Sequence, residues 1–211
     1  MKRVIVGVLL ASGLFAGEFD NAMQAYKNGS FIEALNGFYI LAKNGDAKAQ
    51  YNVGVMYATG KGAQQDLKKA MEWYEKAAKQ GLAKAQYNLA EIYHNLGGVE
   101  EHAYEKAKYW YEKAAQQGIV QAHNNLGALY LEGKGVVKDE QKAFEHFRTA
   151  AEQGDANAQM NVAILYLEGK GTPVDKMKAY ENFKSALHSG KREAQQYLDR
   201  LCSESSWVCQ Q

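Results

Sequence analysis

The stretch AKAQYNVGVMYATGKGAQQDLKKAMEWYEKAAKQG, residues 47–81, decides the fold because the chain repeats its pattern. Its second half recurs as a run that opens on alanine and closes on glycine, at spacings of 36, 37, 36 and 36 residues. The opening alanines are Ala34, Ala70, Ala107, Ala143 and Ala179. A constant period of this length predicts one supersecondary unit per repeat, which buries its apolar face only by stacking on neighbouring units.

Each repeat is predicted to hold two helices joined by a loop. Apolar and small residues fall at helical spacing in the first helix, at Ala49, Gln50, Val53, Gly54 and Tyr57. The same holds for the second helix, at Ala70, Trp73, Tyr74, Ala77 and Ala78. Between them, Gly60 and Gly62 favour a positive φ and end the first helix. Asp66 then suits the N-cap of the second helix, and the missing side chain of Gly54 allows close approach of that helix.

The pattern therefore predicts an all-α fold, an α-solenoid of tandem helix–loop–helix units over residues 17–201. The expected hairpins are 19–44, 46–80, 82–117, 119–153 and 155–189, followed by a terminal helix at 191–201 and a tail at 202–211. The connection from His94 to Val99 carries an extra residue and is expected to be the most distinctive loop. The tyrosines at the Tyr57 position, which recur as Tyr93, Tyr130 and Tyr166, are expected in the core.

The N-terminus follows a different pattern. Lys2 and Arg3 precede the uncharged stretch VIVGVLLASGLFA, residues 4–16. This stretch is shorter than the ~20 residues that a transmembrane helix needs, and a basic start with a short apolar centre is typical of a secretory signal peptide. We predict a signal peptide at residues 1–16, cleaved after Ala16 or alternatively after Gly13, and no transmembrane span in the mature chain. The alternative interpretation is a buried N-terminal helix.

The chain has two cysteines, Cys202 and Cys209, near its far end. In an exported protein such a pair predicts a disulfide, and two free thiols in a frayed tail are the alternative. Trp207, which lies between them, is a candidate apolar plug over the last helix. Two cysteines without a nearby histidine supply only half of a tetrahedral metal site.

The residues of the repeat carry a family resemblance. The pattern A-x-A-Q-Y-N-x-G-x-x-Y-x-x-G-x-G, followed by D-x-x-K-A-x-x-W-Y-x-K-A-A-x-x-G, as it stands from Ala47 to Gly81, resembles the Sel-1-like repeat, a relative of the tetratricopeptide repeat. The resemblance covers about residues 19–201. It implies a right-handed α-solenoid that acts as an adaptor or scaffold for other proteins and is often exported in bacteria.

A narrower resemblance is to the Helicobacter cysteine-rich proteins, Sel-1-like arrays of which some carry a penicillin-binding or β-lactamase assignment. In that family a cysteine pair eight positions apart joins successive helices within each repeat. The equivalent positions here are Ala78 and Gln86, Ala115 and His123, and Ala151 and Gln159, none of which is cysteine. The chain keeps the scaffold without these disulfides, which puts the family's activity in doubt.

No complete catalytic, metal or cofactor motif is present in the sequence. No serine is followed by lysine at the third position, as a serine β-lactamase requires. The five histidines, at positions 94, 102, 123, 146 and 188, are scattered and form no His-Glu-x-x-His pair. The recurring Gly-Lys-Gly is a hairpin breaker, and a net charge of +1 gives no basic excess for nucleic acid. We therefore expect no catalytic residue, no metal, no cofactor and no nucleic-acid partner.

One polar column is the best candidate for a binding site. Asparagine recurs at one position of successive first helices, at Asn52, Asn88, Asn125 and Asn161. The first helices of such a solenoid line its concave surface, and an asparagine amide offers both a donor and an acceptor to a peptide main chain. Our hypothesis is that this column grips an extended peptide, with selectivity from Lys48, Lys84, Tyr51 and Tyr87. The alternative is that each asparagine joins neighbouring repeats or faces water.

The sequence thus predicts an exported, periplasmic or secreted, non-catalytic scaffold that binds a protein or peptide in the bacterial cell envelope. The alternative function is a β-lactamase-like or penicillin-binding hydrolase of the Helicobacter cysteine-rich family, which turnover of nitrocefin would reveal. A third hypothesis, a cytoplasmic adaptor, requires that the N-terminus is not cleaved. The sequence does not identify the partner or the oligomeric state.

Overall fold

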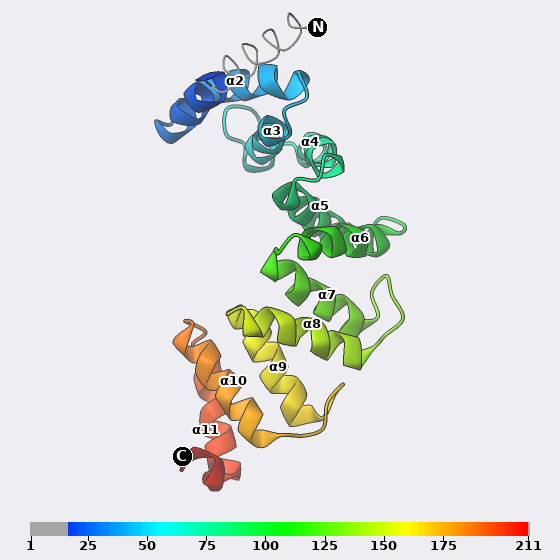
Figure 1. Ribbon diagram of the computed structural model, residues 1–211, viewed down its shortest axis with the longest axis vertical. Coiled ribbons are helices and arrows are strands. Elements are labelled where there is room, and N and C mark those ends of the chain that lie inside the picture. The colour runs from blue at the N-terminus through cyan, green and yellow to red at the C-terminus, as the bar shows by residue number, and fades with distance from the viewer. Residues whose placement is uncertain (1–16, 211) are drawn as a thin grey trace, which may run out of the picture. The chain divides into compact units, whose positions relative to one another are not determined.

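The computed structural model describes residues 17–210, so the predicted signal peptide lies outside the described residues. Within that range all regular secondary structure is helical (Figure 1), which confirms the predicted all-α fold class. Residues 17–27 are helical. The later helices are α2 (Phe31–Lys43), α3 (Ala47–Thr59), α4 (Leu67–Lys79), α5 (Ala83–Leu96), α6 (Ala103–Gln116), α7 (Val120–Glu132), α8 (Glu140–Glu152), α9 (Ala156–Glu168), α10 (Lys176–His188), α11 (Ala194–Glu204) and the 3-10 helix η1 (Ser206–Cys209).

The chain divides into two compact units, one up to Leu89 and one from Ala90 onward. Within each unit, helices that follow one another in sequence pack together, as α3 does on α4 and α9 does on α10. This nearest-neighbour packing is what tandem hairpins require. Among residues 17–210, no helix combines the length and apolar character needed to cross a membrane.

The glycines and aspartates of the loops set the helix ends as predicted. Gly60 adopts the left-handed conformation at the end of α3 (φ 70°), and Gly133 and Gly169 do so after α7 and α9 (φ 69° and 67°). Asp66 caps α4 by accepting a hydrogen bond from the Lys69 backbone N–H at 2.9 Å. Asp139 and Asp175 cap α8 and α10 in the same way. These bonds satisfy amide groups that a helix start leaves unpaired, and they hold the pKa of each aspartate below its usual value.

The α5–α6 connection differs from its predicted bounds. α5 continues through His94 and Asn95 to Leu96, so the loop occupies residues 97–102 instead of 94–99. The reason is the position of the first glycine, which follows the tyrosine of the stripe by three residues in the other repeats but by four here. His102 at the start of α6 has a φ of 57° and no side-chain cap, because the position of the capping aspartate holds Ala103.

The core stripes are confirmed except at one column. Ala49, Gln50, Val53 and Gly54 are buried in α3 as predicted, but the next buried residue is Met56 rather than Tyr57. The equivalents Leu129 and Leu165 are buried too, whereas Tyr130 and Tyr166 are only half-buried and Tyr93 is buried. Residues 56 and 57 both border the apolar stripe of α3. Helical periodicity alone therefore does not show which of the two side chains is buried.

The tyrosines of this column instead cover the start of the second helix. Lysine ammonium groups lie over their rings at 5.2–5.5 Å, in the pairs Lys69–Tyr57, Lys106–Tyr93, Lys142–Tyr130 and Lys178–Tyr166. A cation over an aromatic face is electrostatically favourable. The recurring pair therefore joins the end of each first helix to the first turn of its second helix.

Glycine within the first helices makes room for an aromatic ring. A Cβ at Gly54 would lie 2.7 Å from the ring of Tyr74, and a Cβ at Gly127 would lie 2.7 Å from the ring of Phe147. Neither distance is compatible with a side chain. The predicted close approach at Gly54 is therefore made by the tyrosine ring of α4, with the Ala70 carbonyl oxygen 3.3 Å from the same point.

The second glycine of each Gly-Lys-Gly touches backbone of the preceding hairpin. Gly62 lies against Phe31, Gly135 against Tyr104 and Gly171 against Glu140, which are residues at the start of a second helix. A Cβ at Gly135 would lie 2.6 Å from the Tyr104 carbonyl carbon. The obstructing atoms belong to the backbone, so a change of side-chain rotamer cannot move them away. This glycine is thus a requirement of repeat stacking.

The tail confirms the disulfide and corrects the predicted plug. Cys202 and Cys209 are joined, with their Cα atoms 5.7 Å apart. Trp207 is 56% exposed, whereas its neighbour Val208 is fully buried against the core of α10 and α11. Successive side chains of a 3-10 helix point about 120° apart, and in η1 it is Val208 that faces inward. Ser205 is buried beside it and accepts a hydrogen bond from the Lys176 ammonium at 2.7 Å.

We predict that Gly171→Ala lowers the free energy of unfolding by about 2–4 kcal/mol, because it adds a left-handed alanine and a clash with backbone. Gly171 has a φ of 67°, and its Cβ would lie 2.9 Å from the Gln141 Cα. Gly154→Ala is the matched control, since Gly154 also has a positive φ (85°) but no atom within 4 Å of its Cβ. Urea unfolding followed by circular dichroism measures both. Equal losses in the two variants would show that the backbone contact is unimportant.

Candidate binding surfaces of the repeats

A buried glutamine joins successive hairpins in three places. The side-chain Nε2 of Gln50, Gln86 and Gln159 donates to the carbonyl oxygen of the alanine eight residues earlier, at 3.1, 3.1 and 3.4 Å. The acceptors are Ala42, Ala78 and Ala151, in the last turns of α2, α4 and α8. Each carbonyl also accepts the backbone N–H of the glycine three residues later, so the glutamine adds a second hydrogen bond to it. We call this bond the glutamine clamp.

The clamp occupies positions that the sequence resemblance equated with the cysteine pairs of the Helicobacter cysteine-rich family. The sequence showed that Ala78 and Gln86, and Ala151 and Gln159, stand at those positions. The bond itself was missed, because the glutamines were interpreted only as part of the packing stripe. The available signal was a polar residue inside an apolar stripe, since a buried amide requires partners.

At the fourth such position the clamp is replaced by a histidine pair. His123 of α7 lies 3.1 Å from His146 of α8, measured between their Nδ1 atoms, and the His146 ring stacks on Tyr130 at 5.6 Å. Both histidines are half-buried. One ring must donate and the other accept, so the contact requires at least one neutral ring. Gln153, which directly follows α8, donates a hydrogen bond to the Thr149 carbonyl oxygen of α8 at 3.2 Å.

Burial lowers the pKa of both histidines below the usual 6.5. The neighbouring His123 lowers the pKa of His146 further, and Lys142 adds to this effect, whereas Glu112 and Glu145 oppose it. An unfolded chain takes up these protons at a higher pH than the folded chain does. The pair therefore contributes its full stability above about pH 6.5 and loses it as the pH falls through the lower folded values.

We predict that His123→Gln raises the free energy of unfolding by about 1 kcal/mol at neutral pH, because a glutamine there could clamp the Ala115 carbonyl. The variant should also lose less stability than the wild type between pH 7.5 and pH 5.5, since it removes one titrating group. Urea unfolding at the two pH values measures both effects. His188→Gln, at an exposed position, should leave the pH dependence unchanged. A variant with undiminished pH dependence would contradict the assignment to this pair.

No metal centre is formed by the part of the chain that the structure describes. Among residues 17–210, no group of three or more His, Cys, Asp or Glu side chains could hold a metal ion. The His123–His146 pair supplies two nitrogen atoms only. His102 lies 3.3 Å from Glu101 and 3.5 Å from Glu105, and these three exposed side chains stand on the α5–α6 loop and the start of α6.

The asparagine column consists of half-buried residues of the first helices α3, α5, α7 and α9. Asn161 donates to the Oδ1 of Asn124 in the preceding first helix at 3.0 Å. Asn88 forms a side-chain hydrogen bond with the hydroxyl of Tyr51, whose pKa is raised by burial. Two members of the column are thus held between successive repeats, and each keeps further donor or acceptor capacity.

The four flanking residues of the hypothesis are placed in the first unit. Lys48 and Lys84 are exposed, and Tyr51 and Tyr87 are half-buried. The structure brings Tyr51 together with Asn88 and packs its ring 5.7 Å from Tyr74. Asn124, which partners Asn161, was not among the predicted residues. Its signal was the Asn124-Asn125 doublet, where other repeats have Tyr-Asn or Met-Asn.

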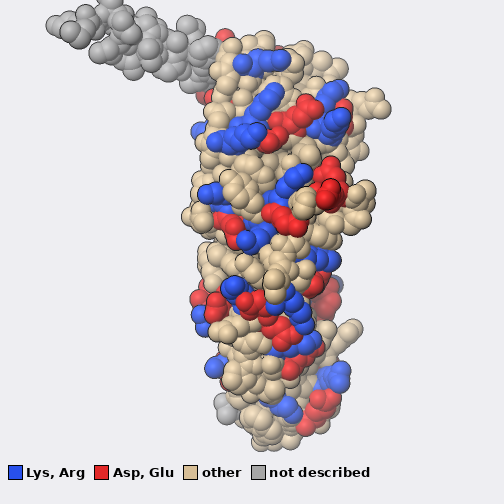
Figure 2. All heavy atoms as spheres, turned by 90° about the vertical axis from the view of Figure 1, so that its right-hand side faces the viewer, with Lys and Arg blue, Asp and Glu red and all other residues tan. Residues whose placement is uncertain are grey.

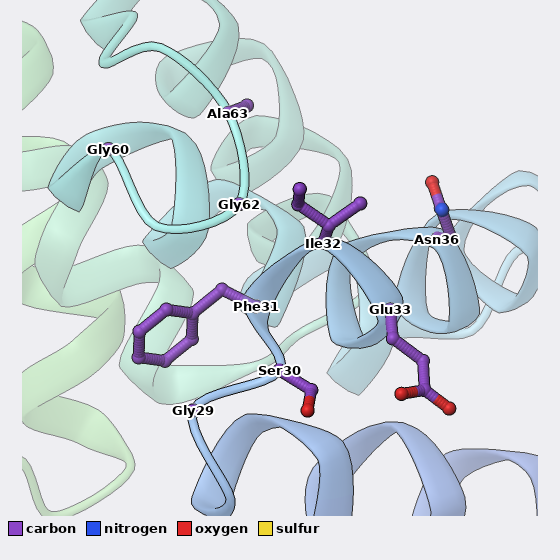
Figure 3. A pocket seen from close by; sticks show the side chains of 9 residues that line it. All are labelled: Gly29, Ser30, Phe31, Ile32, Glu33, Asn36, Gly60, Gly62 and Ala63. Atoms are coloured by element: carbon purple, nitrogen blue, oxygen red, sulfur yellow. The ribbon is translucent and has the colours of Figure 1, made fainter.

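A shallow pocket of about 840 Å³ lies in the first unit beside α2. Figure 3 shows Ile32 and Asn36 projecting from α2 toward the side where the loop at Gly60–Ala63 passes, with Glu33 on the other side. Ile32 is 71% exposed. Phe31 packs on Tyr26 at 5.4 Å. The pocket is mainly apolar with an amide and a carboxylate at its rim, and it carries no catalytic grouping.

Charge is mixed over the face drawn in Figure 2, where acidic and basic side chains alternate without a large area of one sign. Many of these charges form local pairs, such as Lys79 with Glu75 at 2.8 Å and Lys108 with Glu112 at 3.1 Å. Exposed pairs of this kind contribute little stability. The face gives no electrostatic preference for a polyanion.

The comparisons with known proteins assign the family. The description "Sel1 repeat" matches four successive segments, residues 47–82, 83–119, 120–155 and 156–191. This chain belongs to the Sel1-repeat family. The predicted resemblance is confirmed, and Sel1 repeats typically mediate protein–protein interactions. A search of curated proteins finds no match.

Solved structures agree with this assignment. One is c5321, "a protective antigen present in uropathogenic Escherichia coli strains displaying an SLR fold", with 30% identity, a TM-score of 0.84 and 92% of this chain covered. This chain spans only 42% of that protein. A Sel1 repeat protein from Oxalobacter formigenes has 29% identity and a TM-score of 0.79, with 87% of this chain and 76% of that chain covered.

The narrower resemblance also has a structural counterpart. The Helicobacter pylori cysteine-rich protein B has 25% identity and a TM-score of 0.51, with 64% of this chain and 96% of that chain covered. The disulfide that the described residues hold here, Cys202–Cys209, joins α11 to η1 and spans no repeat junction.

Proposed function

We propose that this chain is an exported, non-catalytic Sel1-repeat scaffold that binds a protein or peptide partner through the face of its first helices. The site would be the asparagine column with Lys48, Lys84, Tyr51 and Tyr87 beside it. The single observation that supports this most directly is the family itself, whose repeats typically mediate protein interactions.

The chemistry of the column supports the choice of face. Asn161 uses one N–H on Asn124, which leaves its second N–H and its own carbonyl oxygen for a ligand. A carboxamide can pair with both the N–H and the C=O of a peptide unit. Because the amides are half-buried and partly fixed by neighbours, they would lose little side-chain entropy on binding.

We predict that Asn88→Ala combined with Asn125→Ala weakens binding of the partner about tenfold or more, because two amide contacts are lost. The partner is first captured by crosslinking in intact envelopes and identified by mass spectrometry, and its affinity is then titrated by calorimetry. Asn95→Ala is the matched control, since it removes an exposed asparagine amide of α5 that lies outside the column. Melting curves should be similar for the double variant and the control.

A double variant with a lower melting temperature and unchanged affinity would assign the asparagines to repeat stacking instead. Binding that falls equally in Asn95→Ala would show that the effect is not specific to the column.

Export is part of the proposal and has its own test. The apolar segment at residues 4–16 is followed by the first repeat helix without any further apolar run, and a disulfide is favoured by an oxidising compartment. We predict that the chain recovered from the periplasm or medium begins at Gly17, or after Gly13. N-terminal sequencing of that fraction checks this. A chain that starts at Met1 and fractionates with the cytoplasm would contradict export and support the hypothesis of a cytoplasmic adaptor.

A further inference from the structure

The α3–α4 hairpin shows how a complete glutamine clamp is built. Gln50 donates through Nε2 to the Ala42 carbonyl, and its Oε1 accepts a hydrogen bond from Nε2 of Gln80 at 2.8 Å. Gln80 directly follows α4 and precedes Gly81. Both ends of the buried Gln50 amide are therefore paired, as a buried amide requires.

The α9–α10 hairpin contains the same clamp without its second half. Gln159 is only 9% exposed and donates to the Ala151 carbonyl at 3.4 Å. Its Oε1 is the single buried side-chain polar atom within residues 17–210 that has no hydrogen-bond partner. The residue in register with Gln80, directly before the loop glycine Gly190, is Ser189. A serine side chain ends well short of a glutamine amide, so the donor is missing.

The same glutamine lines a pocket. This pocket, of about 520 Å³, is lined by Gln159 and by residues of α10 and its end: Glu181, Lys184, Ser185, His188 and Ser189. This size falls within the range of small-ligand pockets, about 300–1,000 Å³. An unpaired buried acceptor lowers the free energy of unfolding, and a ligand that enters the pocket and donates to Oε1 would recover part of that loss.

We propose that this pocket binds a primary carboxamide, the group at the end of a glutamine or asparagine side chain, whose N–H donates to Gln159 Oε1. The α3–α4 hairpin supplies the precedent, because there a carboxamide makes this bond at 2.8 Å. Glu181 and Lys184 offset each other in charge at the pocket, which suits a neutral polar group. The site shares α9 with Asn161 of the asparagine column, but it is formed by other residues and does not depend on the proposed function.

The test uses the ¹⁵N-labelled mature chain and follows the side-chain amide signals of Gln159 by NMR. The probe is N-acetyl-L-glutamine N-methylamide, which presents the carboxamide as a peptide does, and free L-glutamine is a second arm. We expect a saturable shift with the capped probe. Its γ-methyl ester analogue keeps the two backbone amides but lacks the side-chain N–H donors, and it should bind about tenfold more weakly. Binding of the free amino acid as well would indicate a metabolite as a possible source, and binding of the capped form alone would indicate a peptide.

Three variants test whether the unpaired Oε1 of Gln159 is the group that binds the probe. Ser189→Gln restores the internal donor, so it should abolish the shift and raise the melting temperature by about 2–4 °C. Gln80→Ser should create a comparable response at Gln50. Ser206→Gln is the matched control, since it adds a glutamine at an exposed serine outside the pocket, and it should change neither property.

Several results would overturn the proposal. These are equal binding of the amide and the ester, absence of any shift at saturating probe, an unchanged response in Ser189→Gln, and an equal loss of the shift in Ser206→Gln. The last result would mean that the loss is not specific to the pocket.

Discussion

The repeat junctions depend on a hydrogen bond between a buried glutamine of one hairpin and a backbone carbonyl at the end of the preceding helix. The carbonyls of Ala42, Ala78 and Ala151 also accept a backbone N–H from a loop glycine, so the glutamine uses their second acceptor site. A hairpin of this kind leaves its apolar face uncovered, and the glutamine holds the next hairpin in place over that face. Where histidine replaces it, the junction becomes sensitive to protonation.

Much of the fold follows from the sequence because its determinants are local. Gly60 ends a helix through its own backbone conformation, and Asp66 begins one through a bond only three residues away. Features set by tertiary contacts were harder to predict. Met56 rather than Tyr57 fills the core, and Val208 rather than Trp207 covers the last helix. In both pairs the residues are neighbours, and only the packing partner decides which one turns inward.

The binding surfaces were less predictable than the fold. The asparagine column was visible as a period, but its bonds to Tyr51 and Asn124 join residues 37 positions apart, and no pattern within one repeat shows which neighbour an amide contacts. The unpaired oxygen of Gln159 was hidden for a similar reason. The replacement of glutamine by Ser189 is plain in the sequence, yet its meaning appears only once Gln80 is seen to contact Gln50.

Two contacts at the repeat junctions depend little on the identity of the neighbouring side chains. Gly62, Gly135 and Gly171 meet main-chain atoms at a helix start, and the clamping glutamines bond to main-chain oxygen at a helix end. These two contacts therefore set no condition on side chains of the neighbouring hairpin, and only the apolar core between hairpins does. A duplicated repeat would carry both main-chain contacts with it, so recombination between coding segments could lengthen such an array with only the core left to adjust.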